Sequence, residues 1–214
     1  MATTDWVDLP GPAGRLEGIL MTPEEEPLAS GVVCHAHPLS GGMMHFKAVF
    51  RAARALVRHR VAVLRFNFRG VGKSTGVHDG GRGEQEDVRA ALDEMERRYP
   101  GRAQVLGGYS FGSVMALRVG ADHPRVRALF ALGFPSASLP DTSFLDGCRK
   151  PRLFVQGQKD EFGPGEELLA LAESLPEPRS VVILPGSDHF FNGYLDELEE
   201  AISRWIATRP WEHK

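Results

Sequence analysis

Short apolar runs alternate with longer amphipathic segments along most of this chain of 214 residues. The apolar runs are too short for helices and contain many β-branched residues, so they predict strands that are buried on both faces. They lie at residues 31–35, 61–66, 104–108, 126–132, 152–156 and 181–184. In the segments between them, apolar residues recur every three or four positions, which is typical of helices. The predicted helices cover residues 45–59 and 84–99, a segment after Gly112, and residues 166–174 and 195–207.

This succession of strand, helix and strand predicts an α/β fold with a doubly wound, mostly parallel sheet. Residues 6–9 and 15–21 flank a turn that contains Gly11 and Gly14, which predicts an antiparallel hairpin on the sheet edge. The chain contains no repeat, low-complexity tract or linker, so we expect a single domain over residues 1–214. A chain of this length buries about 70% of the surface that it exposes when unfolded, so it needs no disulfide or metal for stability.

The charge pattern argues against nucleic acid as a partner. The chain has 25 Lys and Arg residues against 28 Asp and Glu residues, a net charge of −3, and its cations are scattered rather than gathered in a stripe. The uncharged stretch at residues 27–46 contains histidines, prolines and glycines, so no membrane span is expected. Two cysteines are too few for a disulfide framework, and the N-terminus does not look like a signal peptide. A cytoplasmic location is therefore expected.

The sequence Gly108-Tyr109-Ser110-Phe111-Gly112 lies directly after a predicted strand and directly before a predicted helix. A G-x-S-x-G motif in that context predicts a nucleophile elbow, a strained turn in which only glycines fit two residues on either side of the serine. The serine would project above a helix N-terminus, where negative charge is favoured. The simpler interpretation is a tight strand-to-helix turn, which a glycine-rich chain can form without any catalytic role.

A serine hydroxyl is a weak nucleophile without a base, and this fold supplies an acid and a histidine after the serine in the chain. Asp160 follows the predicted strand at residues 152–156, and His189 follows the one at 181–184. Both therefore fall at the sheet edge where Ser110 emerges. We expect His189 to act as base and Asp160 to hold its tautomer. Glu161 and Asp188 are adjacent alternatives for the acid.

Acyl transfer also needs backbone N–H donors for the oxyanion. The residue after the serine, Phe111, supplies one donor, and the loop at residues 37–42 is placed to supply another. Because Pro38 has no N–H, we assign the second donor to Leu39. The alternative is that this loop is only a flexible strand-to-helix connection.

Two other patterns resemble sites but lack essential parts. Residues 70–75 end like a phosphate-binding loop, yet position 67 is Asn67 instead of the required glycine, so nucleotide binding is not expected. His35, His37 and His45 suggest a metal cluster, but the barrel hydrolases that use such a pair need a longer chain and further ligands. No metal and no cofactor are therefore expected.

With these motifs in place, the chain resembles the α/β-hydrolase superfamily, and within it a compact bacterial branch related to dienelactone hydrolases. The resemblance rests on the segments CHAHPLSGGMMHFK, LRFNFRGVGKSTG, GGYSFGSVMAL, QGQKDEF and GSDHFF, in that order. It implies that Ser110, Asp160 and His189 form the catalytic triad, with Leu39 and Phe111 at the oxyanion hole. The nineteen residues at 133–151 are too few for the lid domain that many relatives insert there.

These observations favour a lidless serine hydrolase that cleaves an ester, a thioester or a related acyl bond through an acyl-enzyme. A peptidase is an option, and the alternative class is a non-catalytic scaffold or partner-binding module of the same fold. The expected partner is a small-molecule acyl substrate, and the sequence is compatible with a homodimer. Phe134 and Phe190 are candidate apolar walls for the substrate, although aromatic residues at such positions often only anchor loops.

Overall fold

The computed structural model describes residues 2–139 and 141–212. Its strands are β1 (Thr3–Gly11), β2 (Gly14–Thr22), β3 (Ala29–Cys34), β4 (Val61–Phe66), β5 (Gln104–Tyr109), β6 (Val126–Leu132), β7 (Arg152–Gly157) and β8 (Arg179–Leu184). Its helices are α1 (Lys47–Arg58), α2 (Arg82–Arg98), α3 (Phe111–Gly120), α4 (Gly165–Ser174) and α5 (Leu195–Ala207). Short 3-10 turns lie at Pro38–Ser40, Ser136–Ser138, Ser143–Leu145 and Pro210–Glu212.

The strands of the described chain form one 8-stranded sheet in the order β1-β2-β4-β3-β5-β6-β7-β8. Strand β2 pairs antiparallel with β1 and with β4, and every later pairing, from β3 with β4 to β7 with β8, is parallel. The prediction of a mostly parallel sheet with an N-terminal antiparallel hairpin at its edge is confirmed.

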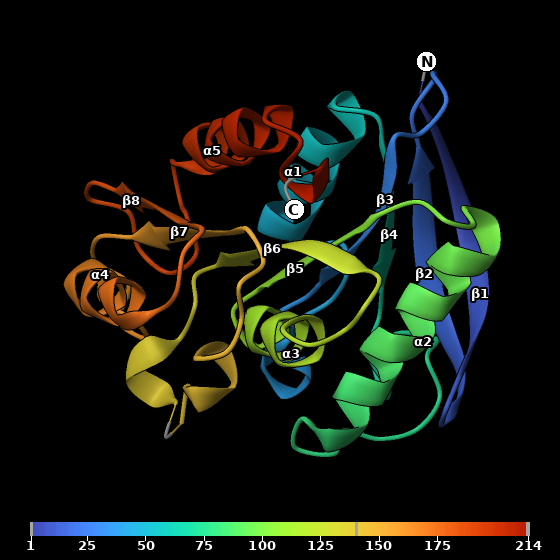
Figure 1. Ribbon diagram of the computed structural model, residues 1–214. Helices are drawn as coiled ribbons and strands as arrows, with labels where there is room; N and C mark the ends of the chain where they lie inside the picture. Colours follow the sequence, from blue (N-terminus) through green and yellow to red (C-terminus); the bar gives the residue numbers. More distant parts are fainter. Residues whose placement is uncertain (1, 140, 213–214) are drawn as a thin grey trace.

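Helices cover both faces of this sheet (Figure 1). Helices α1 and α5 pack on one face, where Leu56 and Ile202 belong to the same buried cluster. Helices α2, α3 and α4 pack on the other face, where Leu92, Leu117 and Leu168 share a second cluster. Because successive residues of a strand point to opposite faces, the central strands are buried on both faces and apolar at most positions, and this explains the short apolar runs in the sequence.

The hairpin is longer than the sequence indicated. The expected strand segments were 6–9 and 15–21, whereas the two strands pair over their whole length, from Thr3 opposite Thr22 to Gly11 opposite Gly14. Strand β1 lies at the sheet edge and most of its side chains are exposed. Its polar residues therefore give no apolar pattern by which its start could be recognised.

The parallel strands bring distant loops to one edge of the sheet. Strands β3, β5, β7 and β8 all end at this edge, so the loops that follow them are neighbours in space. Between β6 and β7 the described residues form only two short 3-10 turns, and no lid is inserted there. Within the described ranges, no helix has the length and apolar character needed to cross a membrane.

Candidate active site

Ser110 occupies a strained turn between β5 and α3. Its backbone has φ 53° and ψ −122°, a positive φ that a residue with a side chain rarely adopts. The strain is held by the sheet, because the Ser110 N–H donates to the carbonyl oxygen of Leu132 at 2.9 Å. The turn leaves the Ser110 hydroxyl partly accessible beside the first residues of α3.

The two glycines of the motif are required by close backbone contacts. A Cβ atom on Gly108 would lie 2.4 Å from the carbonyl oxygen of Gly112, and a Cβ atom on Gly112 would lie 2.3 Å from the carbonyl oxygen of His35. Any side chain at either position would have to move backbone. The structure thus confirms that glycine is needed on both sides of the serine for steric reasons.

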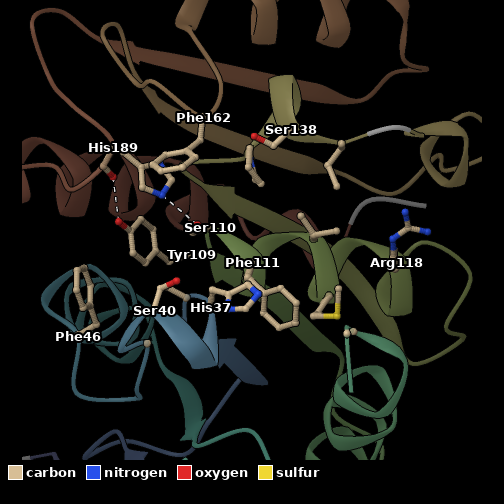
Figure 2. Close-up of a pocket in the computed structure, with 18 of the residues that line it drawn as sticks. His37, Ser40, Phe46, Tyr109, Ser110, Phe111, Arg118, Ser138, Phe162 and His189 are labelled. Atoms are coloured by element: carbon tan, nitrogen blue, oxygen red, sulfur yellow. Dashed lines mark hydrogen bonds between the residues drawn. The ribbon is translucent and has the colours of Figure 1, made fainter. Parts of the chain in front are cut away.

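His189 lies between Ser110 and Asp160, in the loop between β8 and α5. Its Nε2 is 3.0 Å from the Ser110 Oγ, and its Nδ1 is 2.7 Å from the Asp160 Oδ2. The His189 side chain is almost fully buried, and its ring lies near the rings of Tyr109 and Phe162 (Figure 2). Three residues from three different loops therefore form one continuous chain of hydrogen bonds.

Asp160 is held as an acceptor on both carboxylate oxygens. Its Oδ1 accepts the backbone N–H groups of Phe162 and Gly163, at 2.9 and 3.2 Å. Its Oδ2, which faces His189, also accepts the side-chain amide of Gln156 at 2.9 Å. Four donors around this buried carboxylate, three of them from residues other than His189, fix its orientation.

The two alternative acids point elsewhere. The Asp188 carboxylate accepts hydrogen bonds from the backbone and the side chain of Asn192, at 3.1 and 3.0 Å. Glu161 is exposed to solvent. Asp160 is thus the carboxylate that the structure places against the His189 ring.

Two supporting residues were not singled out in the sequence. Gln156 binds Asp160 and also accepts the N–H of Phe134 and donates to the carbonyl oxygen of Gly163. The Tyr109 hydroxyl donates to the carbonyl oxygen of His189 at 3.1 Å, and burial raises the pKa of this phenol, so it stays protonated. Gln156 carried a signal, since it is a polar residue that directly follows the apolar run Leu153–Val155.

The two expected oxyanion donors differ in their surroundings. Phe111 is the first residue of α3, so its N–H has no acceptor within the helix and lies next to Ser110. The Leu39 N–H, the other expected donor, donates to the His37 Nδ1 at 3.2 Å, and its assignment to the oxyanion hole stays a prediction. His37 caps the 3-10 turn at Pro38–Ser40 in this way, and the Leu39 side chain is 76% exposed.

This cap also defines the protonation of His37. Because its Nδ1 accepts a hydrogen bond, the neutral ring carries its proton on Nε2. Burial, together with the nearby His78, lowers the pKa of His37. The ring therefore stays neutral at physiological pH, where it packs against Phe111 with ring centroids 5.0 Å apart.

A cavity of about 560 Å³ opens beside Ser110 and His189, a size typical of small-molecule sites. Phe190 lines it, as expected from the sequence, and is 46% exposed. The expectation for Phe134 is corrected: its side chain is fully buried and packs against Phe154 in the core. The aromatic lining also includes residues that were not expected as cavity walls, namely Phe46, Tyr109, Phe111 and Phe162.

His35 supports the loop that follows β3. Its ring is fully buried, with Nδ1 2.7 Å from the carbonyl oxygen of Ala36 and Nε2 accepting the N–H of Phe68 at 3.0 Å. Both ring nitrogens are thereby occupied. Among the described residues, no group of three or more His, Cys, Asp or Glu side chains is arranged to hold a metal ion.

The burial of His35 predicts acid sensitivity. Burial lowers its pKa from 6.5 to about 4, so between these values the unfolded chain binds a proton that the folded chain does not. The stabilisation is complete above about pH 6.5 and is lost as the pH falls towards 4, by about 3 kcal/mol in total. Urea unfolding at a series of pH values should show this loss, with a flatter pH dependence in His35→Gln.

The slope that is left in His35→Gln should come from His37, His59 and His123, whose pKa values are also lowered, chiefly by burial. Near pH 4 it should also come from carboxylates with lowered pKa values, such as Glu94 and Glu199. An unchanged slope in that variant would mean that folding does not hold the His35 ring neutral.

The comparisons with known proteins agree with this geometry. Residues 29–202 match the family described as the alpha/beta hydrolase domain, so the chain belongs to the alpha/beta hydrolase family. An uncharacterized protein of Rickettsia prowazekii is 35% identical over 208 residues, which cover 92% of this chain and 87% of that protein.

Two solved structures are similar over nearly the whole chain. An alpha-beta serine hydrolase homologue from Coxiella burnetii is 37% identical, with a TM-score of 0.88, and the match covers 94% of this chain and 96% of that one. A serine hydrolase without a lid from Xanthomonas campestris is 32% identical, also with a TM-score of 0.88, over 96% of this chain and 94% of that one. The chain thus lies in the compact, lidless branch of the family, and its relatives support a hydrolase activity.

Proposed function

We propose that this protein is a serine hydrolase that cleaves an ester or thioester of a small molecule. The observation that carries the proposal is the hydrogen-bonded chain from Ser110 through His189 to Asp160, at 3.0 and 2.7 Å, on the wall of a cavity of about 560 Å³. These distances lie within the range that an activated nucleophile and its base require. The Phe111 N–H at the start of α3 is the proposed oxyanion donor.

In the proposed mechanism, the Ser110 Oγ attacks the carbonyl carbon while the His189 Nε2 takes the hydroxyl proton. The carbonyl oxygen becomes an oxyanion beside the Phe111 N–H and the positive end of the α3 dipole. When the bond to the leaving group breaks, His189 returns the proton to the departing oxygen or sulfur and an acyl-Ser110 ester is left. Water then attacks this ester with His189 as base, which releases the acid and regenerates Ser110.

Asp160 orients the base in both half-reactions. It accepts a hydrogen bond from the Nδ1–H of His189, so the free electron pair stays on Nε2, and its charge stabilises the imidazolium that forms. Because Gln156, Phe162 and Gly163 hold the carboxylate, the ring needs no rearrangement when the proton arrives.

A fluorophosphonate probe tests this proposal directly. We expect the folded protein to form a covalent adduct on Ser110, located by mass spectrometry, and expect His189→Ala to lose the labelling because the hydroxyl is then no longer activated. An absence of labelling in folded protein would contradict the proposal and favour a non-catalytic, partner-binding role for the same fold.

A further inference from the structure

The end of the cavity away from Ser110 and His189 contains the Arg118 guanidinium (Figure 2). Among the described residues, the cavity lining includes no Asp or Glu side chain, and its other arginine, Arg82, is 89% exposed and pairs with Asp79. Val114, Met115 and Leu139 contribute apolar surface to the lining. In a chain with a net charge of −3, a guanidinium in a cavity whose lining has no carboxylate indicates selection for an anionic substrate.

Helix α3 sets the distance between the charge and the nucleophile. Ser110, Val114 and Arg118 are spaced four residues apart, so they lie along one side of the helix, and all three line the cavity. Eight residues of helix span about 12 Å. Figure 2 shows Arg118 at the opposite end of the cavity from Ser110 and His189.

The Arg118 guanidinium is oriented without being neutralised by an ion pair of the kind seen elsewhere in the chain. Among the described residues no carboxylate pairs with Arg118, whereas Arg51 pairs with Glu199 at 2.9 Å and Arg69 with Asp87 at 2.8 Å. Arg118 instead lies over the Phe144 ring, 4.3 Å from its centroid, and donates to the backbone carbonyl of Asp141 at 3.4 Å.

The Asp141 carboxylate is close enough to interact electrostatically with the Arg118 guanidinium. It is exposed and accepts the N–H of Ser143 at 2.8 Å, and its pKa is lowered mainly by this hydrogen bond and further by Arg118. A guanidinium has five N–H donors, so Arg118 retains donors for a ligand.

We propose that Arg118 binds an anionic group at the far end of the substrate. The cavity then selects acyl esters or thioesters in which an apolar chain separates the scissile carbonyl from a carboxylate. This proposal rests on the proposed function, because it assumes that the carbonyl is held at Ser110.

Two matched pairs of esters test the proposal. The first pair consists of the 4-nitrophenyl monoester of a linear dicarboxylic acid and the same ester with its free carboxyl capped as a methyl ester. In the second pair the alcohol part of the ester carries the anionic group: one member has a carboxylate there, and the other has the neutral amide in its place. In at least one pair, we expect the anionic ester to have a kcat/KM at least about tenfold higher, the size of one charge-assisted contact. The responding pair shows which part of the substrate fills the cavity.

Three variants assign this preference to Arg118. Arg118→Met keeps an apolar stem and should bring the ratio of the two kcat/KM values close to one, whereas Arg118→Lys should retain part of it. Arg82→Gln is the matched control, because the Arg82 side chain is 89% exposed and already pairs with Asp79, so its loss should change the ratio less than about threefold. The preference should also fall as ionic strength rises.

Hydrolysis of 4-nitrophenyl acetate, which is too short to reach Arg118, separates the two proposals. Wild-type turnover of the acetate with no preference in either pair, or with the same preference in Arg118→Met, would overturn the role of Arg118 alone. An Arg118→Met protein with lower thermal stability and an unchanged ratio would show that Arg118 only anchors Phe144 and Asp141. No turnover of the acetate by folded wild-type protein would overturn the proposed function, and this inference with it.

Discussion

Replacement of Ser110 by alanine is expected to lower kcat for a simple ester by about 10⁴-fold or more, because the proposed nucleophile, base and acid act as a unit. The free energy of unfolding should stay nearly unchanged, since the backbone strain at φ 53° is present with either side chain and, among the described residues, the hydroxyl forms a hydrogen bond to His189 alone. Initial rates with 4-nitrophenyl acetate and a thermal melt of the same preparation measure both quantities.

Ser180→Ala provides the matched control for this substitution. Ser180 is an exposed residue of β8 and does not line the cavity beside Ser110, so its loss should leave both rate and stability close to wild type. Turnover at a wild-type rate in Ser110→Ala would show that Ser110 is not the nucleophile.

Replacement of Asp160 by asparagine is expected to lower kcat by about 10³-fold or more while the fold is retained. Asparagine can present its N–H₂ to the His189 Nδ1, which places the proton on Nε2 and removes the electron pair that should accept the Ser110 proton. The loss should appear in kcat more than in KM, because the ring orientation matters mainly in the transition state. Steady-state kinetics over a range of ester concentrations resolve the two.

Asp188→Asn is the comparison that tests the choice of acid. Asp188 bonds to Asn192 and not to the His189 ring, so this variant should retain more than a tenth of the wild-type kcat. If Asp188→Asn proved more damaging than Asp160→Asn, the acid would have been assigned to the wrong residue.

The regular elements of this chain were predictable to the extent that burial leaves a periodic pattern. Strands β4 and β6 and helix α5 have the bounds that the sequence indicated, because their apolar residues face a core along their whole length. Strand β1 was predicted too short, since its edge position exposes polar residues such as Thr3 and Asp5, which leave no apolar pattern. The meeting of Ser110, Asp160 and His189 followed from their positions at strand ends.

Details of the site depended on contacts that a sequence does not display. The direction of the Leu39 N–H was decided by the His37 side chain, which caps the turn. Whether Phe134 faced the cavity or the core was decided by Gln156, which lies 22 residues away and binds the Phe134 backbone. The spacing of Ser110 and Arg118 could be counted from the sequence, but only the structure shows that one cavity joins them.

Different parts of the molecule carry the proposed chemistry and its selectivity. Ser110 directly follows a strand, and Asp160 and His189 lie in loops that follow two other strands. Other lining residues, Gly80, Gly81, Pro135, Ser138 and Leu139, lie in the segments that connect the larger elements. Such connecting segments tolerate changes in length and composition that a sheet does not. Exchange of these connecting segments should therefore change which substrates fit beside Arg118, while Ser110, Asp160 and His189 stay in place. This makes the fold a suitable starting point for directed evolution.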